Sequence, residues 1–215
     1  MKTKILAILA AFALVCAFTV NASAQTMLTD DVAFVKLGYS MMKVDYDEEY
    51  VDELEGNGFN LQGEYNLNLG SVLLGFGLEY TYMPVEVSGT DVDGDDYSAD
   101  YTLHYLSPML SAKFITAGGF YLGAGLAGKY LVGQSAEEKG DDTVFDEEID
   151  LWANGLIGFM TPIQEFVYLD IEGRFGYNLT NKQFEKTKAS EYEIKSQYDI
   201  AIYVGVGYRV AARGF

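Results

Sequence analysis

The amino-acid sequence predicts an all-β protein, an eight-stranded antiparallel up-and-down transmembrane β-barrel, and three observations support this fold. Apolar and polar residues alternate with a period of two along eight segments, as they do in strands with one apolar face. The connections between these segments alternate between short and long. The chain also begins with the pattern of an export signal.

The first 24 residues are predicted to be a targeting segment. Two lysines occur within the first four positions, an apolar run covers residues 5–20, and Asn-Ala-Ser-Ala follows. This order predicts a secretory signal peptide at residues 1–24, cleaved after Ala24, and a barrel domain at residues 25–215. Since no later stretch has about 18 consecutive apolar residues, membrane insertion of the exported chain must use strands.

Two segments show the strand pattern most strictly. In Asn57–Leu69 the odd positions from 59 onward are apolar or glycine, and the even positions are Asn, Gln or Glu. Val167–Leu179 repeats this pattern with Asp, Glu, Arg and Asn on its polar face. A helix would not place these two sets on separate sides. The other six segments are Val35–Val44, Val72–Met83, Tyr101–Phe114, Phe120–Val132, Ile149–Met160 and Tyr198–Val210.

The first segment contains a change of phase. Its apolar residues occupy odd positions up to Met41 and even positions from Met42 onward. One extra residue in a strand moves all following side chains to the opposite face. The sequence therefore predicts a β-bulge at Met41–Met42.

The lengths of the connections predict an asymmetric barrel. Short connections lie at residues 69–71, 116–119 and 161–165, and long polar ones at 45–56, 84–100, 133–148 and 180–197. In an up-and-down barrel, alternate connections fall at the same end. Bacterial outer-membrane barrels have short periplasmic turns and long extracellular loops. Their tilted strands need about 9–11 residues to cross the bilayer, which the eight segments provide.

Period-two alternation does not itself show which face points inward, and a soluble lipocalin-like barrel would have the same pattern inverted. The polar faces here are rich in Asn, Gly, Ser and Thr and lack the dense Lys and Glu of a solvated surface. Aromatic residues near the strand ends of the apolar face favour the interfacial girdles of a membrane barrel. They are Tyr39, Phe59, Tyr80, Tyr82, Tyr101, Tyr105, Phe159, Tyr177, Tyr198 and Tyr208.

Charged residues on the polar face are predicted to fill the lumen. The inward candidates are Glu64, Glu79, His104, Lys113, Lys129, Asp150, Asp170, Glu172, Arg174 and Arg209. Eight-stranded barrels enclose just enough room for side chains, so charges of both signs are expected to form an ion-paired, polar network that blocks the lumen. Glu172 and Arg174, two apart on one face, are expected neighbours. Lys113 and Lys129, on adjacent strands, are expected to meet the acids across the lumen. A narrow, porin-like pathway for small solutes or ions is the alternative.

An outer-membrane lipid-modifying enzyme is a second alternative. Such enzymes need a base, usually histidine, beside a serine nucleophile. The single histidine, His104, alternates with Tyr101, Leu103 and Tyr105 and is predicted to point into the lumen. No serine stands in a catalytic spacing with it, so the sequence predicts no catalytic residues and no enzyme.

The strong negative charge is concentrated in the long connections. The chain has 14 Lys and Arg against 32 Asp and Glu, which argues against nucleic acid as a partner. Asp91, Asp93 and Asp95 have the spacing of calcium-binding loops but lack the closing glutamate, so weak divalent-cation binding is the one metal prediction. No other cofactor is predicted. The expected partners are outer-membrane lipid, lipopolysaccharide and a basic extracellular molecule, and the barrel is expected to be monomeric.

Three segments also carry a resemblance. They are Tyr-Leu-Ser-Pro-Met-Leu-Ser-Ala-Lys-Phe at 105–114, Phe-Tyr-Leu-Gly-Ala-Gly at 120–125, and Asp-Ile-Glu-Gly-Arg-Phe-Gly-Tyr-Asn-Leu-Thr-Asn at 170–181. Together they resemble the small outer-membrane β-barrel proteins of Bacteroidetes-type bacteria, over about residues 28 to 215. The resemblance implies a barrel in the outer membrane that serves envelope structure or surface interaction, and it does not single out an activity. Such barrels end their last strand on an aromatic residue, for which Tyr208 and Phe215 are the two candidates.

Overall fold

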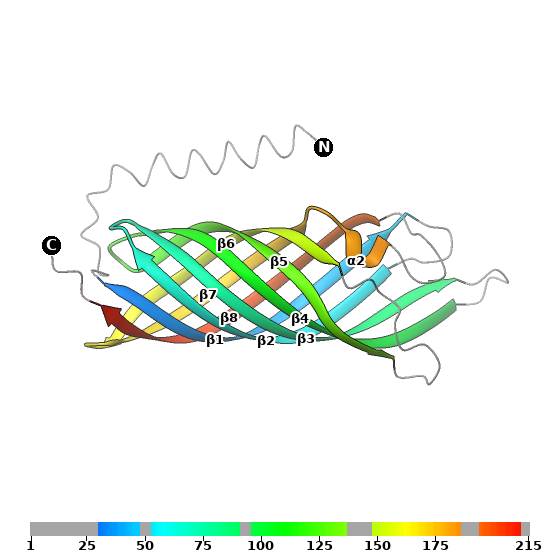
Figure 1. Ribbon diagram of the computed structural model, residues 1–215, viewed down its shortest axis with the longest axis horizontal. Coiled ribbons are helices and arrows are strands. Elements are labelled where there is room, and N and C mark those ends of the chain that lie inside the picture. Colours follow the sequence, from blue (N-terminus) through cyan, green and yellow to red (C-terminus); the bar gives the residue numbers. More distant parts are fainter. Residues whose placement is uncertain (1–29, 48–52, 91–95, 137–147, 186–193, 212–215) are drawn as a thin grey trace, which may run out of the picture.

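The computed structural model describes residues 30–47, 53–90, 96–136, 148–185 and 194–211. Eight strands form one closed barrel (Figure 1). They are β1 (Asp31–Tyr46), β2 (Glu53–Asn68), β3 (Val72–Thr90), β4 (Asp96–Ile115), β5 (Phe120–Ala136), β6 (Ile149–Gln164), β7 (Val167–Asn178) and β8 (Ile194–Ala211), with one short helix, α2 (Lys182–Glu185). The predicted signal peptide and Phe215 lie outside the described residues.

Closure of the barrel comes from pairing between the first and last strands. Every strand is antiparallel to both neighbours, and β1 pairs with β8 as well as with β2. Leu37 of β1, for example, lies opposite Leu61 of β2 and Val204 of β8. Closure leaves no sheet edge with unpaired backbone groups, which is the condition for strands to cross a bilayer. The one helix in the described part of the chain is too short to span a membrane.

The two ends of the barrel differ as the connection lengths predict. The short turns follow β2, β4 and β6 and lie at one end, here called the turn end. The turn at 116–119 is closed by Gly119, whose backbone φ of 84° suits glycine and whose amide donates to the Thr116 carbonyl oxygen at 2.9 Å. The strand ends that flank the long connections lie at the opposite end together with α2; this end is here called the loop end (Figure 1).

The outer surface of the barrel is apolar. Side chains at alternate positions of every strand are exposed, and most of them are large and hydrophobic. They include Val35, Leu37, Leu61, Phe76, Leu78, Leu110, Leu126, Ile157, Ile171, Phe175, Ile202, Val204 and Val206. A continuous apolar band of this kind would be unstable in water and fits the hydrocarbon core of a bilayer. The prediction of a transmembrane rather than a soluble barrel is therefore confirmed.

Toward the loop end the two faces of the strands exchange polarity while the register stays unbroken. Met42 and Val44 point into the lumen and Lys43 points outward, in direct continuation of the alternation below them. Pairing of β1 with β2 and with β8 is continuous across Met41 and Met42. The predicted β-bulge is therefore wrong. The alternation of side chains continues unbroken through Met41 and Met42, and only the environment of the two strand faces changes there.

The same exchange corrects the predicted outer girdle. Tyr101 and Tyr105 of β4 point inward, where Tyr105 is buried and Tyr101 packs partly buried against the apolar side chains at the loop end. The other predicted girdle residues lie on outward positions. Tyr39 packs against Phe59, and Tyr198 stacks on the outward-facing Phe175, which was not in the predicted girdle. Most strands also extend farther than predicted, whereas β7 ends one residue before its predicted limit.

A charge in the apolar band should destabilise the barrel in a position-dependent way. Leu37, near the middle of β1, is 68% exposed on the outer face. We expect Leu37→Arg to lower the free energy of unfolding by about 2–4 kcal/mol, against about 0–1 kcal/mol for Leu69→Arg in the β2–β3 turn. Urea unfolding from lipid vesicles measures both. Equal effects at the two positions would contradict a membrane-embedded band.

Candidate functional site

The middle of the lumen holds charged side chains that contact one another across the barrel. Each occupies an inward position, because side chains alternate between the two faces along every strand. We call this group the central charge network; it consists of Lys36, Glu64, Glu79, Lys113, Asp170, Glu172 and Arg174. All seven residues are buried, and they come from five different strands.

Two lysines bridge three carboxylates in the part of the network nearer the turn end. The Nζ atom of Lys36 lies 2.6 Å from Glu64 Oε2, 2.6 Å from Asp170 Oδ2 and 2.9 Å from Glu172 Oε2. The Nζ atom of Lys113 lies 2.6 Å from Glu64 Oε1 and 2.8 Å from Glu172 Oε2. One oxygen from each of the three carboxylates lies within 4.8 Å of the others, a spacing that metal ligands can have. In this structure the ammonium groups of the lysines hold them together.

Arg174 organises the other half of the network. Its Nη1 donates to Glu79 Oε2 at 2.9 Å, and its Nη2 donates to Glu172 Oε1 and to Gln62 Oε1, each at 2.8 Å. The guanidinium carbon lies 4.2 Å from the ring centroid of Tyr203, whose hydroxyl donates to Glu79 Oε2 at 2.8 Å. The rigid fork of arginine suits such a site, because it can donate in several directions at once.

Every carboxylate of the network has at least one cationic partner. This is a physical requirement, since an unpaired charge in a low-dielectric interior is strongly destabilising. A tyrosine adds to the pairing: the Tyr121 hydroxyl lies 2.9 Å from both Asp170 Oδ1 and Glu172 Oε2. The arrangement fixes the side chains in place across the full width of the lumen.

A second ion pair lies nearer the loop end. Lys129 pairs with Asp199, and its Nζ atom lies 3.8 Å from the ring centroid of the buried Trp152. A cation over the face of an indole ring is attracted by the ring quadrupole. Lys129 therefore has both an ionic and an aromatic partner.

Apolar side chains close the lumen on both sides of the charges. The turn-end layer consists of Val32, Phe34, Leu73, Ile115, Tyr121, Met160 and Tyr168. The loop-end layer consists of Met42, Val44, Leu54, Met83, Val85, Leu103, Tyr105, Leu131 and Phe184. The polar network is thus enclosed between two hydrophobic layers.

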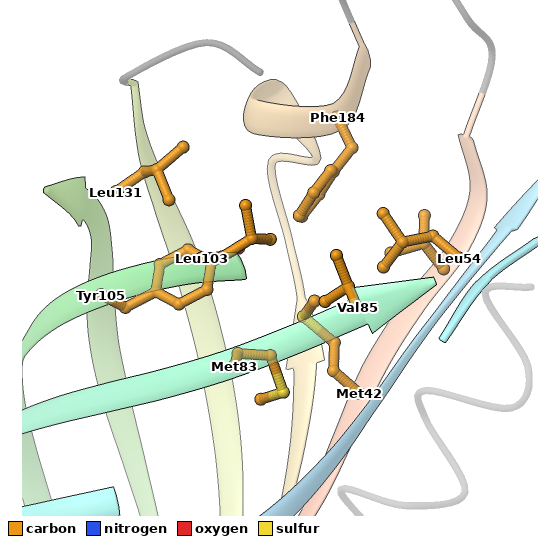
Figure 2. Packing of buried hydrophobic residues seen from close by; sticks show 9 residues of the cluster. Met42, Leu54, Met83, Val85, Leu103, Tyr105, Leu131 and Phe184 are labelled. Atoms are coloured by element: carbon orange, nitrogen blue, oxygen red, sulfur yellow. The ribbon is translucent and has the colours of Figure 1, made fainter. Parts of the chain in front are cut away.

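Phe184 completes the loop-end layer from outside the barrel strands. It belongs to α2, and Figure 2 shows its ring pointing from the short helix into the group of strand side chains. The residue is fully buried. The connection between β7 and β8 therefore caps the mouth of the barrel with an aromatic side chain.

Polar contacts hold α2 in this position. The carboxylate of the buried Asp150 accepts a hydrogen bond from the backbone amide of Lys182 at 2.7 Å. The side-chain amide of Gln183 donates to the carbonyl oxygens of Lys129 and Glu148, each at 2.6 Å. Satisfying the first amide of a helix with a carboxylate is a usual capping device.

The structure places nine of the ten predicted lumen residues on inward positions. These nine are Glu64, Glu79, Lys113, Lys129, Asp150, Asp170, Glu172, Arg174 and Arg209. Six of them join the central charge network, and the expected contact between Glu172 and Arg174 is part of it. Arg209 lies apart, at the turn end, where it pairs with Asp30 and stacks over Phe166.

Correction is needed for His104, which points outward. Its Nδ1 lies 2.7 Å from the Tyr80 hydroxyl oxygen, and its ring meets that of Tyr82 edge-on, with centroids 5.5 Å apart. The flanking residues Leu103 and Tyr105 are the ones that enter the lumen, as part of the loop-end layer. The prediction failed because these apolar neighbours were expected to face the lipid, which placed His104, on the opposite face of the strand, in the lumen.

Sequence reasoning missed several lumen residues, of which Lys36 is the most important. Lys36 alternates with Val35 and Leu37 and therefore already stood on the polar face of its segment. Tyr121 and Tyr203 were also missed, because a tyrosine does not reveal which face it occupies. The possible calcium ligands Asp91, Asp93 and Asp95 lie outside the described residues.

Solved structures of small outer-membrane barrels are similar to this chain. Neisserial surface protein A matches with a TM-score of 0.50 and 18% identity, over 83% of this chain and 97% of that one. The outer membrane protein OprG from Pseudomonas aeruginosa matches with a TM-score of 0.46 and 13% identity, over 88% and 100% of the two chains. Ail, the attachment invasion locus protein of Yersinia pestis, matches with a TM-score of 0.38 and 14% identity, over 85% and 100%. No protein-family model and no curated protein matches the chain.

The fold is that of a small outer-membrane barrel. This assignment of the fold rests on the closed eight-stranded topology and on the structural similarity to Neisserial surface protein A. The narrower resemblance to the Bacteroidetes-type barrels stays a prediction from the sequence.

Removing a lysine from the central charge network should be far more costly than removing one from the surface. We expect Lys36→Met to lower the free energy of unfolding by about 3–5 kcal/mol, because Asp170 loses its cationic partner inside the barrel. Lys43→Met, on the outer face of the same strand, should cost about 0–1 kcal/mol. Urea unfolding of the two variants decides this, and similar losses would show that the buried pairs are no stronger than surface ones.

Proposed function

We propose that the protein is an integral barrel of the bacterial outer membrane that serves envelope structure or surface interaction. The observation that carries this proposal is the filled lumen, in which the central charge network lies between the turn-end and loop-end layers. A barrel filled in this way is suited to be a rigid carrier of its loops rather than a conduit. On this proposal it needs no resident cofactor.

Two further features support the location and orientation. The apolar outer band suits a bilayer, and the predicted signal peptide would direct the chain across the inner membrane. Barrels of this class keep short turns on the periplasmic side. The turn end would therefore face the periplasm and the loop end the cell exterior, with the barrel acting as a monomer.

Acidic side chains give the loop end its surface character. The strand register aligns Lys43 with Glu55, Glu55 with Glu86, and Glu86 with Asp100, so one lysine and three acids form a row across four adjacent strands. Carboxylates on directly opposite positions repel one another unless water or cations screen them. This row supports a role beside the phosphates of lipopolysaccharide, with divalent cations between, or against a basic extracellular partner. Any weak cation binding by Asp91, Asp93 and Asp95 would add to it.

The filled lumen predicts that the barrel does not conduct ions. Purified barrel inserted into planar lipid bilayers should show no steady current steps, because apolar side chains at both ends interrupt any path of water. A large-diameter porin measured in the same bilayers provides the positive control. Discrete, reproducible steps from folded barrel would favour the alternative of a narrow pore.

The surroundings of His104 favour a structural role over catalysis. Its contacts are with Tyr80 and Tyr82, in an aromatic group on the outer face. We expect the purified protein to release no fatty acid from phospholipid or lipid A above the level of the His104→Ala variant. Lipid cleavage or acyl transfer that disappears in His104→Ala would establish the enzyme alternative, provided that the variant still runs as a folded barrel on an unheated gel.

A further inference from the structure

Pairing between β4 and β5 is interrupted at one point of the membrane-facing band. Ser107 and Pro108 have no partner in the register, and the intact pairs on either side of them place Pro108 opposite Gly128. In a hydrogen-bonded pair of antiparallel strands, each residue donates its N–H to the carbonyl oxygen of the residue opposite. Because proline has no N–H, the carbonyl oxygen of Gly128 has no donor on β4.

No side chain among the described residues supplies the missing donor. Two buried donors face the lumen near this point, Ser107 of β4 and Trp152 of β6, which pairs with the residue before Gly128. Neither the Ser107 hydroxyl nor the Trp152 Nε1 makes a hydrogen bond. Within a bilayer, a backbone carbonyl without a donor is strongly destabilising. The barrel wall therefore contains an acceptor that needs a donor from outside the chain.

Gly128 opens this part of the wall toward the lipid. It occupies an outward position of β5, and an added Cβ atom would contact only Ile149, whose Cγ2 would lie 3.4 Å away. The next outward residues along the strand are Tyr130 toward the loop end and Leu126 toward the turn end, and both are exposed. We call the carbonyl of Gly128, together with the outward-facing Pro108 opposite it, the Gly128 site.

The depth of the site in the membrane indicates which donors can reach it. Exposed aromatic rings such as that of Tyr130 lie at the level of the lipid headgroups. Two residues of a tilted strand correspond to about 5 Å of depth, so Gly128 lies just below that level. This is where headgroups are linked to acyl chains. An ester linkage has only acceptor oxygens, whereas an amide linkage has an N–H that can donate.

We propose that the Gly128 site binds the amide N–H of a lipid that carries an amide-linked acyl chain. The inference rests on the proposed function, because only a barrel in a membrane meets such a lipid. The lipid N–H replaces the donor that Pro108 lacks, and the acyl chain lies along the exposed side chains of Leu110 and Leu126, which pair with each other just below the site. A lipid with ester-linked chains alone cannot make this hydrogen bond.

The test is the stability of the whole barrel in phosphatidylcholine vesicles that contain a minor fraction of ceramide or of ceramide methylated at its amide nitrogen. The two additives differ only in whether that nitrogen carries a hydrogen. Ceramide should move the midpoint of urea unfolding to a higher concentration. It should also be retained on the purified barrel about tenfold better than its methylated form, as one hydrogen bond of about 1.4 kcal/mol would give.

The outcomes separate this inference from the proposed function. Equal midpoints and equal retention for the two additives would overturn the inference and leave a water molecule as the partner of the carbonyl. A barrel that inserts into neither kind of vesicle would instead contradict the proposed function itself.

Two matched proline variants locate the acceptor. Pro108→Ala restores the backbone N–H and should abolish the preference for ceramide. Pro84→Ala makes the same change at the interruption between β2 and β3, where Pro84 lies opposite Asn57. That point lies two residues beyond Tyr82 toward the loop end, where headgroups and water supply donors, so the preference should stay as in the wild type. A full preference for ceramide in Pro108→Ala would show that the Gly128 carbonyl is not the acceptor.

Two glycine variants provide an independent test that leaves both prolines in place. Gly128→Leu covers the carbonyl from the lipid side and should also abolish the preference for ceramide. Gly63→Leu is its control on the outer face of β2, where an added Cβ atom would meet nothing within 4 Å, and it should keep the preference. Each variant is compared with itself in the two lipids, so a general change of stability cancels. Equal preferences in the two leucine variants would exclude the Gly128 site.

Discussion

The salt bridges of Lys36 tie β1 to β2 on one side and to β7 across the lumen, and the interior depends on contacts of this kind. Such a contact exists only when the barrel is closed, because β1 and β7 are not neighbours in the sheet. Closure also satisfies the backbone of every strand. Pairing of the backbone around the barrel and pairing of charges across it therefore support each other, which favours cooperative formation of the whole barrel.

The lumen can hold these long side chains because small residues stand beside them. Gly205 lies against the stem of Lys36, where an added Cβ would come within 2.6 Å of its Cγ, and Gly38 leaves room for the ring of Tyr203. Eight strands enclose little space, so each large inward residue needs a small one next to it. The glycines of the inward faces thus follow from the packing of the charged and aromatic residues rather than from turns.

Much of this architecture could be predicted from the sequence, and the failures share one cause. Period-two alternation assigned the eight strands and most of the charged lumen residues, and the lengths of the connections assigned the two ends. The alternation does not reveal whether a strand face meets lipid, water or the barrel interior at a given position along the barrel axis. Near the loop end the interior of the barrel becomes apolar. For this reason Tyr105 was predicted to face the lipid and His104 to face the lumen. The apparent phase change at Met42 was interpreted as a β-bulge for the same reason, although the pairing is continuous there. The partners of each charge also depend on register and curvature, which a single strand pattern does not contain.

A polar lumen has a consequence for the route of the chain to its membrane. If the inward residues were apolar like the outward ones, residues 105–115 of β4 would become one unbroken apolar run. Ser107, Ser111 and Lys113 interrupt that run, and interruptions of this kind keep a membrane strand from the long apolar stretches that form helical spans. The charged residues among them are buried when the barrel closes, and a buried charge must find a partner. The central charge network meets both demands, which explains why the lumen is filled with charges instead of hydrocarbon.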